Sequence, residues 1–420
     1  MGAAAGSADM SNHLLRAAEA RLPEMTAFLQ QLVRTPSVNG RETEAGVAHS
    51  VAAEAARLGF RAQLMARDPA RPNVLVTWGQ GPAGFAFIAH TDTVAEGNPD
   101  AWTTQPFEAA VRDGRLYGRG AADNKAGLVC GLYALALLRD EGLLEPAMFH
   151  VTVAGVVDEE SGASSPLGVR ALLDEGLLAG SRGAIYAYSS DIVCIGHRGL
   201  LRVILRAQGQ TIHSGSAAWS HGLGGINAVT GLAAILLRLE TLDLPASAPR
   251  GFEGLRCTLT PGTRISGGEF ESMVPAHAEA LVDIRLMPGQ SPEDVLAAIK
   301  RIVVEETARR PGLRVSLEVK NQLPGAAIPM NHPLVMLAQR ATTEMTGTAW
   351  AIAGAGPANE GYMLIEAGIP TLCGFGPTGD NAHAPDEWVE LASLPRTVVM
   401  FTNIVREYLQ QVSVEKSHNS

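Results

Sequence analysis

The sequence predicts an α/β protein in which a domain built on a mostly parallel sheet is interrupted by a smaller, inserted α+β domain. Residues 85–90 and 149–157 are short apolar runs without polar alternation, typical of strands buried on both faces of a sheet. The apolar run at 125–139, between them, has the length of a helix. From about residue 198 the elements change to the order β-α-β-β-α-β, which is typical of a small α+β domain.

Local signals predict the individual elements in order. Residues 11–34 favour helix, interrupted at Pro23 because proline lacks a backbone donor. A second helix is expected over residues 41–58, where apolar side chains recur at helical spacing and Gly59 follows. In the first domain we also expect strands over 73–78 and 85–90, a helix over 125–139 and a strand over 149–157.

The inserted domain is predicted in the same way. Its helices are expected over residues 225–240 and from Ser291 onward, where a capping hydroxyl is followed by Pro292 and two acids that favour a helix start. Its strands are expected over residues 200–207, 255–265, 278–286 and 314–319. A helix over 333–346 and a buried strand over 369–376 then resume the first domain.

These assignments predict the domain boundaries. The first domain takes residues 11–197 and 320–413, and the inserted domain takes residues 198–319. We expect residues 1–10 and 414–420 to be disordered, since they are small or polar and lack a core-facing pattern.

Composition excludes several classes of protein. The chain has 420 residues, 46% hydrophobic and 18% charged, the balance of a folded globular protein. Its longest apolar run, at 127–138, falls short of the roughly 20 residues that span a bilayer. A net charge of −10 argues against nucleic-acid and anionic-membrane partners. Four widely spaced cysteines and the lack of a secretory signal in residues 1–9 favour reduced, buried thiols and a cytoplasmic location.

Acids and histidines follow the predicted apolar strands. Individually they have ordinary explanations as helix caps, turn residues or surface histidines. Together they come from four strand ends, which meet at one edge of an open α/β sheet. Crowded acids repel one another unless a cation lies between them, and imidazoles with carboxylates suit Zn²⁺ or another first-row divalent ion. The candidate residues are His90, Asp92, Asp123, Glu159, Glu160 and His383.

These motifs, together with residues 32–38 and the inserted domain, resemble the aminoacylase, acetylornithine deacetylase, succinyl-diaminopimelate desuccinylase and glutamate carboxypeptidase family of co-catalytic zinc amidohydrolases. The resemblance implies that His90 ligates one metal ion and that Asp123 bridges two. It implies that Glu160 and His383 hold the other ion.

The same resemblance assigns the groups around the metal ions. It implies that Asp92 orients His90 and that Glu159 is the general base. His213, in residues 210–214, is similar to a lid histidine that reaches across a dimer interface to stabilise the oxyanion. Arg285 is similar to a residue that binds a substrate carboxylate, although an ion pair with Asp283 explains it equally well. A homodimer through residues 198–319 is therefore expected.

The sequence departs from the family pattern at three places. An ungapped match puts Ala187 where the remaining acidic ligand belongs, and Asp191 is the next carboxylate along the chain. We therefore expect two zinc ions, or one if Asp191 does not complete the second site, with Co²⁺ or Mn²⁺ as alternatives. In the inserted domain Ser272 stands where many relatives have an asparagine, and in the loop at 354–360 Asn359 or Glu360 lies near the place of an aspartate. Both places are where the family recognises substrates, so the family's individual substrates are not carried over.

These observations predict a metal-dependent hydrolase that cleaves the amide bond of an N-acyl amino acid or small peptide. Metal ions would polarise the amide carbonyl and activate water, with Glu159 taking its proton. Two alternatives stay open: a non-catalytic relative with an incomplete second metal site that binds a ligand or a partner, and a dinuclear aminopeptidase that recognises a free α-amine.

Overall fold

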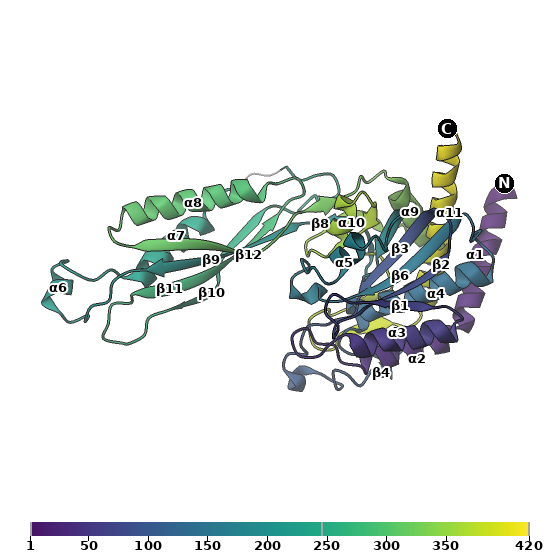
Figure 1. The fold of residues 1–420 in the computed structure, drawn as a ribbon, viewed down its shortest axis with the longest axis horizontal. Helices are drawn as coiled ribbons and strands as arrows, with labels where there is room; N and C mark the ends of the chain where they lie inside the picture. The colour runs from purple at the N-terminus through teal and green to yellow at the C-terminus, as the bar shows by residue number, and fades with distance from the viewer. Residues whose placement is uncertain (1, 245–246, 419–420) are drawn as a thin grey trace. The chain divides into compact units, whose positions relative to one another are not determined.

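A computed structural model of the chain describes residues 2–244 and 247–418 and divides into two compact units. The first unit contains the chain up to Gly196, residues Ala327–Ala355 and the chain from Asn359 onward. The second unit contains His197–Ala326 with Gly356–Ala358 (Figure 1). The second unit is thus inserted into the chain of the first.

The first unit is built on a six-stranded, mostly parallel sheet, as the sequence predicts. Strands β6, β3, β7 and β15 run parallel to one another, and β2 and β1 add an antiparallel edge. Across the sheet the order is β1 (Ala62–Met65), β2 (Asn73–Gly79), β6 (Phe149–Val156), β3 (Ala83–His90), β7 (Ser181–Tyr186) and β15 (Thr371–Leu372).

Helices cover this sheet. On one face, Gly131 of α4 lies against Phe87, and Phe87 stacks on Phe401 of α11 with ring centroids 4.8 Å apart. Alternation along the strands turns Ile88 and Tyr186, which are paired in register, to the opposite face, where the Tyr186 hydroxyl meets Glu360 at the start of α10. The helices are α1 (Gly2–Ala20), α2 (Leu22–Val33), α3 (Ala45–Arg57), α4 (Ala126–Asp140), α5 (Val169–Asp174), α9 (Pro333–Thr346), α10 (Gly361–Glu366) and α11 (Ser393–His418).

Helix α4 is apolar on all sides because it is buried on all sides. By length and hydropathy alone, Ala121–Asp140 could cross a membrane, and it is the one such segment among the residues described. The tested window is, however, entirely buried within the fold. Such a segment is typical of a core helix.

Two small sheets complete the first unit. One has the strand order β16 (Gly379–Asp380), β17 (Trp388–Glu390), β5 (Arg115–Tyr117) and β4 (Ala110–Arg112). The other has the order β13 (Ala326–Ala327), β8 (Ile192–His197) and β14 (Ala351–Ala355). The first of these sheets joins a late hairpin of the chain to the segment that precedes α4.

The second unit is a four-stranded antiparallel sheet with two long helices. Its elements are β9 (Gly199–Gln208), α6 (Ala217–Ser220), α7 (Ala228–Glu240), β10 (Thr258–Gly267), β11 (His277–Leu286), α8 (Pro292–Ala308) and β12 (Arg314–Leu323), and the strand order is β10-β11-β9-β12. Alternate side chains of β11 are buried in one core with α7 and α8, whereas Arg206 and Glu279 pair across neighbouring strands of this sheet.

The ends of the chain differ from what we expected. Helix α1 begins at Gly2 and α11 ends at His418, so helix extends into both segments expected to be disordered, where alanines at the N-terminus favour it. Met1 and residues 419–420 lie outside the described residues. The strand expected over 369–376 is shorter, since only Thr371–Leu372 pair with β7. All four cysteines are free thiols, with Cys257 half-buried and the others buried.

Candidate metal centre

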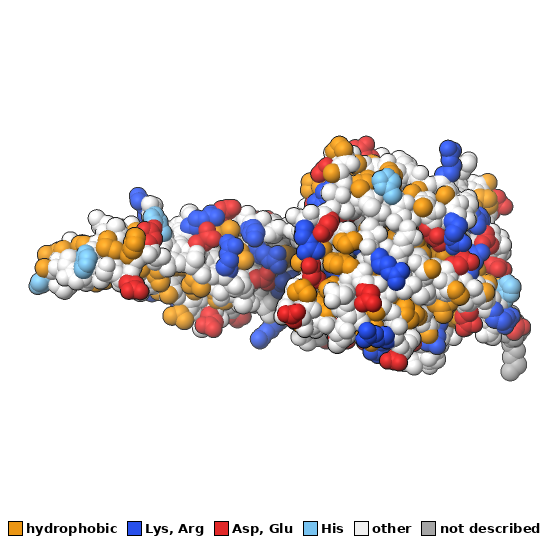
Figure 2. Space-filling model, turned by 90° about the horizontal axis from the view of Figure 1, so that it is seen from below, with side chains coloured by type: hydrophobic (Ala, Val, Ile, Leu, Met, Phe, Trp, Pro, Cys, Tyr) orange, Lys and Arg blue, Asp and Glu red, His pale blue; other side chains and the backbone are white. Residues whose placement is uncertain are grey.

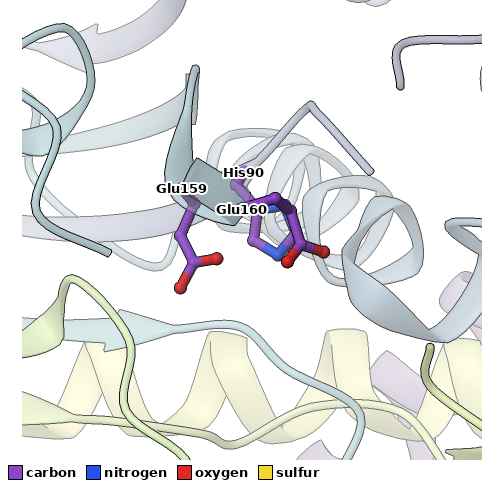
Figure 3. Close-up of side chains that lie close together, drawn as sticks. All are labelled: His90, Glu159 and Glu160. Atoms are coloured by element: carbon purple, nitrogen blue, oxygen red, sulfur yellow. The ribbon is translucent and has the colours of Figure 1, made fainter. Parts of the chain in front are cut away.

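Two histidines and three acids from distant parts of the chain converge in the first unit. Ligand atoms of His90, Glu159 and Glu160 all lie within 4.8 Å of one another, and so do those of Asp123, Glu160 and His383. Figure 3 shows the first group, in which the two glutamates leave neighbouring positions and their carboxylates lie on two sides of the imidazole in this view. Glu160 belongs to both groups, so the five side chains form one cluster.

The parallel pairing of β3 and β6 explains how the first group forms. His90 ends β3 and is in register with Val156, which ends β6. Glu159 and Glu160 follow β6 within four residues, in the short turn η3 (Glu159–Ser161). The ends of parallel strands meet at one edge of a sheet, so the imidazole and the two acids emerge together.

A left-handed residue turns the chain between β6 and the two glutamates. Asp158 has φ +67°, a conformation that is uncommon for a residue with a side chain. Its carboxylate accepts hydrogen bonds from Asn39, Arg71 and Ser165, which hold it in place. The backbone N–H groups of Glu159 and Glu160 consequently face the carboxylate of Asp92, at 3.2 and 3.0 Å.

Asp92 orients His90 by its backbone more than by its side chain. Nδ1 of His90 lies 2.9 Å from the carbonyl oxygen of Asp92 and 3.7 Å from its Oδ1. A carbonyl only accepts, so Nδ1 carries the proton and Nε2 is the atom that faces the cluster. The Asp92 carboxylate is instead bonded to the Glu159 and Glu160 amides and to Asn39.

Asp123 lies between the two histidines and presents one oxygen to each. Its Oδ1 is 2.8 Å from Nε2 of His90, and its Oδ2 is 3.2 Å from Nε2 of His383. Burial opposes ionisation of Asp123, but its hydrogen bonds to the two histidines hold its pKa below the usual range. Hydrogen bonds of His383 to Asp123 and Glu160 raise the pKa of His383 to about 10. Burial opposes protonation of His90, yet the bond to Asp123 raises the pKa of His90 well above its usual value.

A buried glutamate that the sequence did not single out fixes the position of Asp123. Asp123 is in an irregular turn, η2 (Ala121–Lys125), entered through Gly120 at φ +87°, where a side chain would be strained and would contact Thr93. The Glu387 carboxylate accepts the N–H groups of Gly120, Ala122 and Asp123, and it pairs with Arg119 at 2.5 Å.

Glu387 also connects this turn to His383. His383 is in the loop between β16 and β17, Glu387 directly precedes β17, and β17 pairs with β5 just before the turn. The side chain of His383 is 53% exposed, in contrast to the other ligands of the cluster. Its Nε2 lies 3.1 Å from Oε1 of Glu160.

Glu159 is buried and makes no hydrogen bond through its carboxylate to any residue that the structure describes. Burial, partly offset by the charge of His90 and reinforced by Glu160 and Asp123, raises the pKa of Glu159 well above its usual value. A carboxyl group with a raised pKa and no hydrogen-bond partner among the described residues is suited to exchange a proton with a bound molecule.

Neither Asp191 nor Ala187, the two residues considered for the remaining ligand of the second metal site, belongs to the cluster of converging ligands. Asp191 is exposed just before β8 and belongs to neither group of converging ligands among the described residues. Ala187 is buried against the start of α4: a side-chain carbon on Gly127 would lie 2.9 Å from its Cβ. Next to it, the Tyr188 ring lies 5.5 Å from that of His90 and stacks on Tyr186.

Three further residues expected at the site have other partners within their own units. His213, in the second unit, is exposed and accepts the N–H of Gly215 through Nδ1. Arg285 forms the ion pair with Asp283, at 2.8 Å, that was its alternative explanation. Asn359 is buried, donating to the Cys373 carbonyl and accepting from the Gly361 amide. Substrate contact by these residues stays a prediction.

The donor set fits a divalent metal ion. Imidazole nitrogens and carboxylate oxygens without a thiolate suit zinc and other first-row ions, and three acids this close repel one another unless a cation compensates them. One oxygen of Asp123 for each histidine is the arrangement of a bridging carboxylate, and Nε2 of His90 is directed toward it by the Asp92 carbonyl.

Comparison with known proteins decides the family. The model of peptidase family M20/M25/M40 matches residues 86–407, which include all five side chains of the cluster. The chain belongs to this family. This M20 protein is therefore a hydrolase of peptide or amide bonds, and its converging His, Asp and Glu side chains form a candidate metal site.

Solved structures show the same fold. Human carnosine dipeptidase 1 matches this M20 protein with a TM-score of 0.71 at 18% identity, over 96% of this chain and 99% of that one. The aminopeptidase PepT from Bacillus cereus matches with 0.72 at 21%, over 92% and 98%. The M20 metallo-carboxypeptidase Sso-CP2 from Sulfolobus solfataricus matches with 0.71 at 19%, over 93% and 99%. Since these structures are those of a dipeptidase, an aminopeptidase and a carboxypeptidase, the shared fold does not choose among these activities.

Proposed function

We propose that this M20 protein hydrolyses the amide bond of an N-acyl amino acid or a small peptide, with divalent metal ions held by His90, Asp123, Glu160 and His383. The observation that carries the proposal is Asp123, whose two oxygens face the two histidines at 2.8 and 3.2 Å. When bound, the ions, for which zinc is our first choice, would polarise the scissile carbonyl and lower the pKa of a nearby water molecule.

The residue best placed to transfer protons during hydrolysis is Glu159. Its carboxylate adjoins the ligand Glu160 in sequence, faces the same cluster and has no partner among the described residues. We assign it the role of general base, which takes a proton from water and returns it to the leaving nitrogen. Asp92 supports this role indirectly, since it accepts the amide N–H groups of both glutamates and so fixes their direction.

Three further parts of the proposal concern the assembly, the location and the type of substrate. A homodimer through residues 198–319 is supported by large apolar side chains exposed on the second unit, such as Leu237, Ile265 and Val304. A cytoplasmic location is supported by the four free thiols. Figure 2 shows basic and acidic side chains interspersed on the face in view, and with the net charge of −10 this supports a small-molecule substrate rather than a nucleic acid.

Metal removal and restoration tests the function. The full chain is treated with a chelator, dialysed, and assayed with Zn²⁺, Co²⁺ or Mn²⁺ on a panel that pairs N-acetylated amino acids with dipeptides bearing free amino termini. We expect activity to be lost on chelation and restored by at least one ion. A panel unaffected by chelation or by metal addition would exclude metal-dependent hydrolysis.

The same panel separates the alternatives. An aminopeptidase, which the likeness to PepT makes a specific candidate, requires a free amino terminus, whereas a deacylase acts on the blocked substrates. A non-catalytic relative would bind metal or ligand without turnover of either series. Elemental analysis of the same samples distinguishes a protein that lacks metal from one that holds it and does not react.

A further inference from the structure

The end of β7 raises a question about the metal site that the family relationship does not answer. Ala187 is buried with its backbone carbonyl against Gly127 of α4, and its methyl side chain brings no donor atom to the cluster. The following residue, Tyr188, is the one whose side chain lies beside His90, with ring centroids 5.5 Å apart. Tyr188 is held there by stacking on Tyr186 at 5.4 Å. The neighbour of His90 from this strand is therefore a phenol.

The donors are unequally divided between the two histidines. His383 has two carboxylates close to its Nε2, Glu160 at 3.1 Å and Asp123 at 3.2 Å. His90 has Asp123 at 2.8 Å from Nε2, which it shares with His383, and the acids that converge with it in one group are Glu159 and Glu160. Asp92 lies on the other side of the ring, 3.7 Å from Nδ1, and the buried Glu360 belongs to neither group of converging ligands. Glu160 is already engaged by His383, and Glu159 is needed free if it is to carry protons. Among the described residues, His90 itself is therefore the one ligand that this metal position does not share with the other position or with catalysis.

We propose that the two metal positions are unequal: a divalent ion binds tightly between Asp123, Glu160 and His383, and a second binds weakly at His90 because Tyr188 lies beside it instead of a carboxylate. An unmodified phenol is neutral near pH 7 and offers a cation less attraction than a carboxylate does. This inference rests on the proposed metal-dependent function and specifies how its site is loaded.

The geometry indicates a substitution that would make the metal affinities of the two positions more nearly equal. A glutamate side chain carries its carboxylate about as far from the backbone as tyrosine carries the centre of its ring. Tyr188→Glu would therefore place a carboxylate next to His90, where the ring lies now. Tyr188→Phe keeps the ring and removes only the hydroxyl, which makes it the matched control. Asp191→Asn tests the other candidate donor, an exposed acid a few residues away.

The test is a Zn²⁺ titration of the metal-free full-length chain in competition with a chromophoric chelator, with elemental analysis after gel filtration in metal-free buffer. For the wild type we expect one retained equivalent and a second ion bound at least about tenfold more weakly. Tyr188→Glu should tighten the second ion by about tenfold or more. Tyr188→Phe and Asp191→Asn should leave both affinities unchanged. A circular dichroism spectrum and melting curve identify any variant that fails to fold.

Each contrary outcome is specific. Two equally tight ions in the wild type would overturn the inference and leave the proposed hydrolase function intact. A folded Tyr188→Glu variant without a tighter second ion would also overturn it. Weaker binding in Asp191→Asn would show that Asp191 is the missing donor. If the wild type binds no ion and hydrolyses nothing, the proposed function itself fails. The wild-type stoichiometry remains decisive even if Tyr188→Glu does not fold.

Discussion

The carboxylate of Glu387 accepts the backbone N–H of Asp123 at 2.9 Å, although 264 residues of sequence separate the two. One oxygen of Glu387 bonds to Ala122 and Asp123, and the other bonds to Gly120 and Arg119. The hairpin loop that carries His383 is thereby joined to the turn that carries Asp123. A buried ion pair with Arg119 thus serves to position two ligands.

This relationship predicts a large loss of stability in Glu387→Gln. Removing one charge of a buried pair leaves Arg119 uncompensated, and such changes cost about 3–5 kcal/mol. Urea unfolding of the metal-free chain measures the difference. Glu390→Gln three residues further on, in β17, where the side chain forms no ion pair among the described residues, should stay within about 0.5 kcal/mol of wild type. Equal stability of the two variants would contradict the structural role of Glu387.

Glu159→Gln should separate catalysis from metal binding. The substitution removes the group that exchanges protons and keeps the shape of the side chain, so turnover should fall about 10²–10⁴-fold. Metal content by elemental analysis should equal that of wild type, since Glu160 and His383 are untouched. Glu175→Gln, an exposed acid near the end of α5, should retain wild-type turnover. Loss of metal from Glu159→Gln would show that Glu159 is a ligand rather than the base.

Metal binding should release protons near neutral pH. Contacts with Asp123 and Glu160 raise the pKa of His383 to about 10 in the metal-free chain, so this imidazole is protonated at pH 7.5, and the bond to Asp123 also raises the pKa of His90. A metal ion displaces the proton of His383, and its affinity should rise with pH until His383 is neutral without metal. Calorimetry in buffers of different ionisation enthalpy should detect the release of at least about one proton per loaded chain.

His383→Asn provides the control for this measurement. The variant has one protonated imidazole fewer and should release about one proton less. Proton release that does not change in His383→Asn, or metal affinity that falls as pH rises from 6 to 8, would contradict the assignment of these histidines as ligands.

Glu360 should make the metal-free protein less stable as pH rises. Its carboxyl is fully buried, and burial raises its pKa from 4.5 to about 8. The unfolded chain ionises at the lower value, so the folded state loses stability between about pH 4.5 and pH 8. Glu360→Gln removes this penalty and can still accept the Tyr186 hydroxyl, which lies at 3.4 Å.

Thermal or urea unfolding at two pH values measures that penalty. The stability advantage of Glu360→Gln over wild type should be roughly 2–4 kcal/mol greater at pH 8.5 than at pH 5. Glu366→Gln, at the exposed end of the same helix, should show no such pH-dependent gain. If the advantage were equal at both pH values, the pKa of Glu360 would not differ between the folded and the unfolded chain in this range.

Local signals in the sequence predicted most of the fold. Ser291 and Pro292 indicated a helix start, and the Ser291 side chain accepts the N–H of Asp294 at the beginning of α8. Apolar runs predicted β3 and β6, and the sheet they form is mostly parallel. Such signals succeed because caps and buried strands depend on a few neighbouring residues.

Contacts between distant segments were not predictable in the same way. Glu387 bonds to backbone amides in a turn far away in sequence, so the residue types give no sign of it; its place before the apolar strand β17 is the one available hint. Asn39, which joins Asp92 to Asp158, gives no signal either. The ungapped match at Ala187 did not indicate that the side chain of Tyr188 lies beside His90. A shift of one residue at the end of a strand changes which side chain faces the site, and the residue types do not reveal such a shift.

The unequal exposure of the ligands has a kinetic consequence. Asp123 and His90 are shielded, whereas His383 lies open to water on its hairpin loop. An ion that enters from solvent would therefore reach His383 before the buried donors, and a departing ion would leave His383 last. Exchange at this centre should be governed by the motion of one loop, so that a shift of the hairpin between β16 and β17 would set how long metal resides without altering any buried donor.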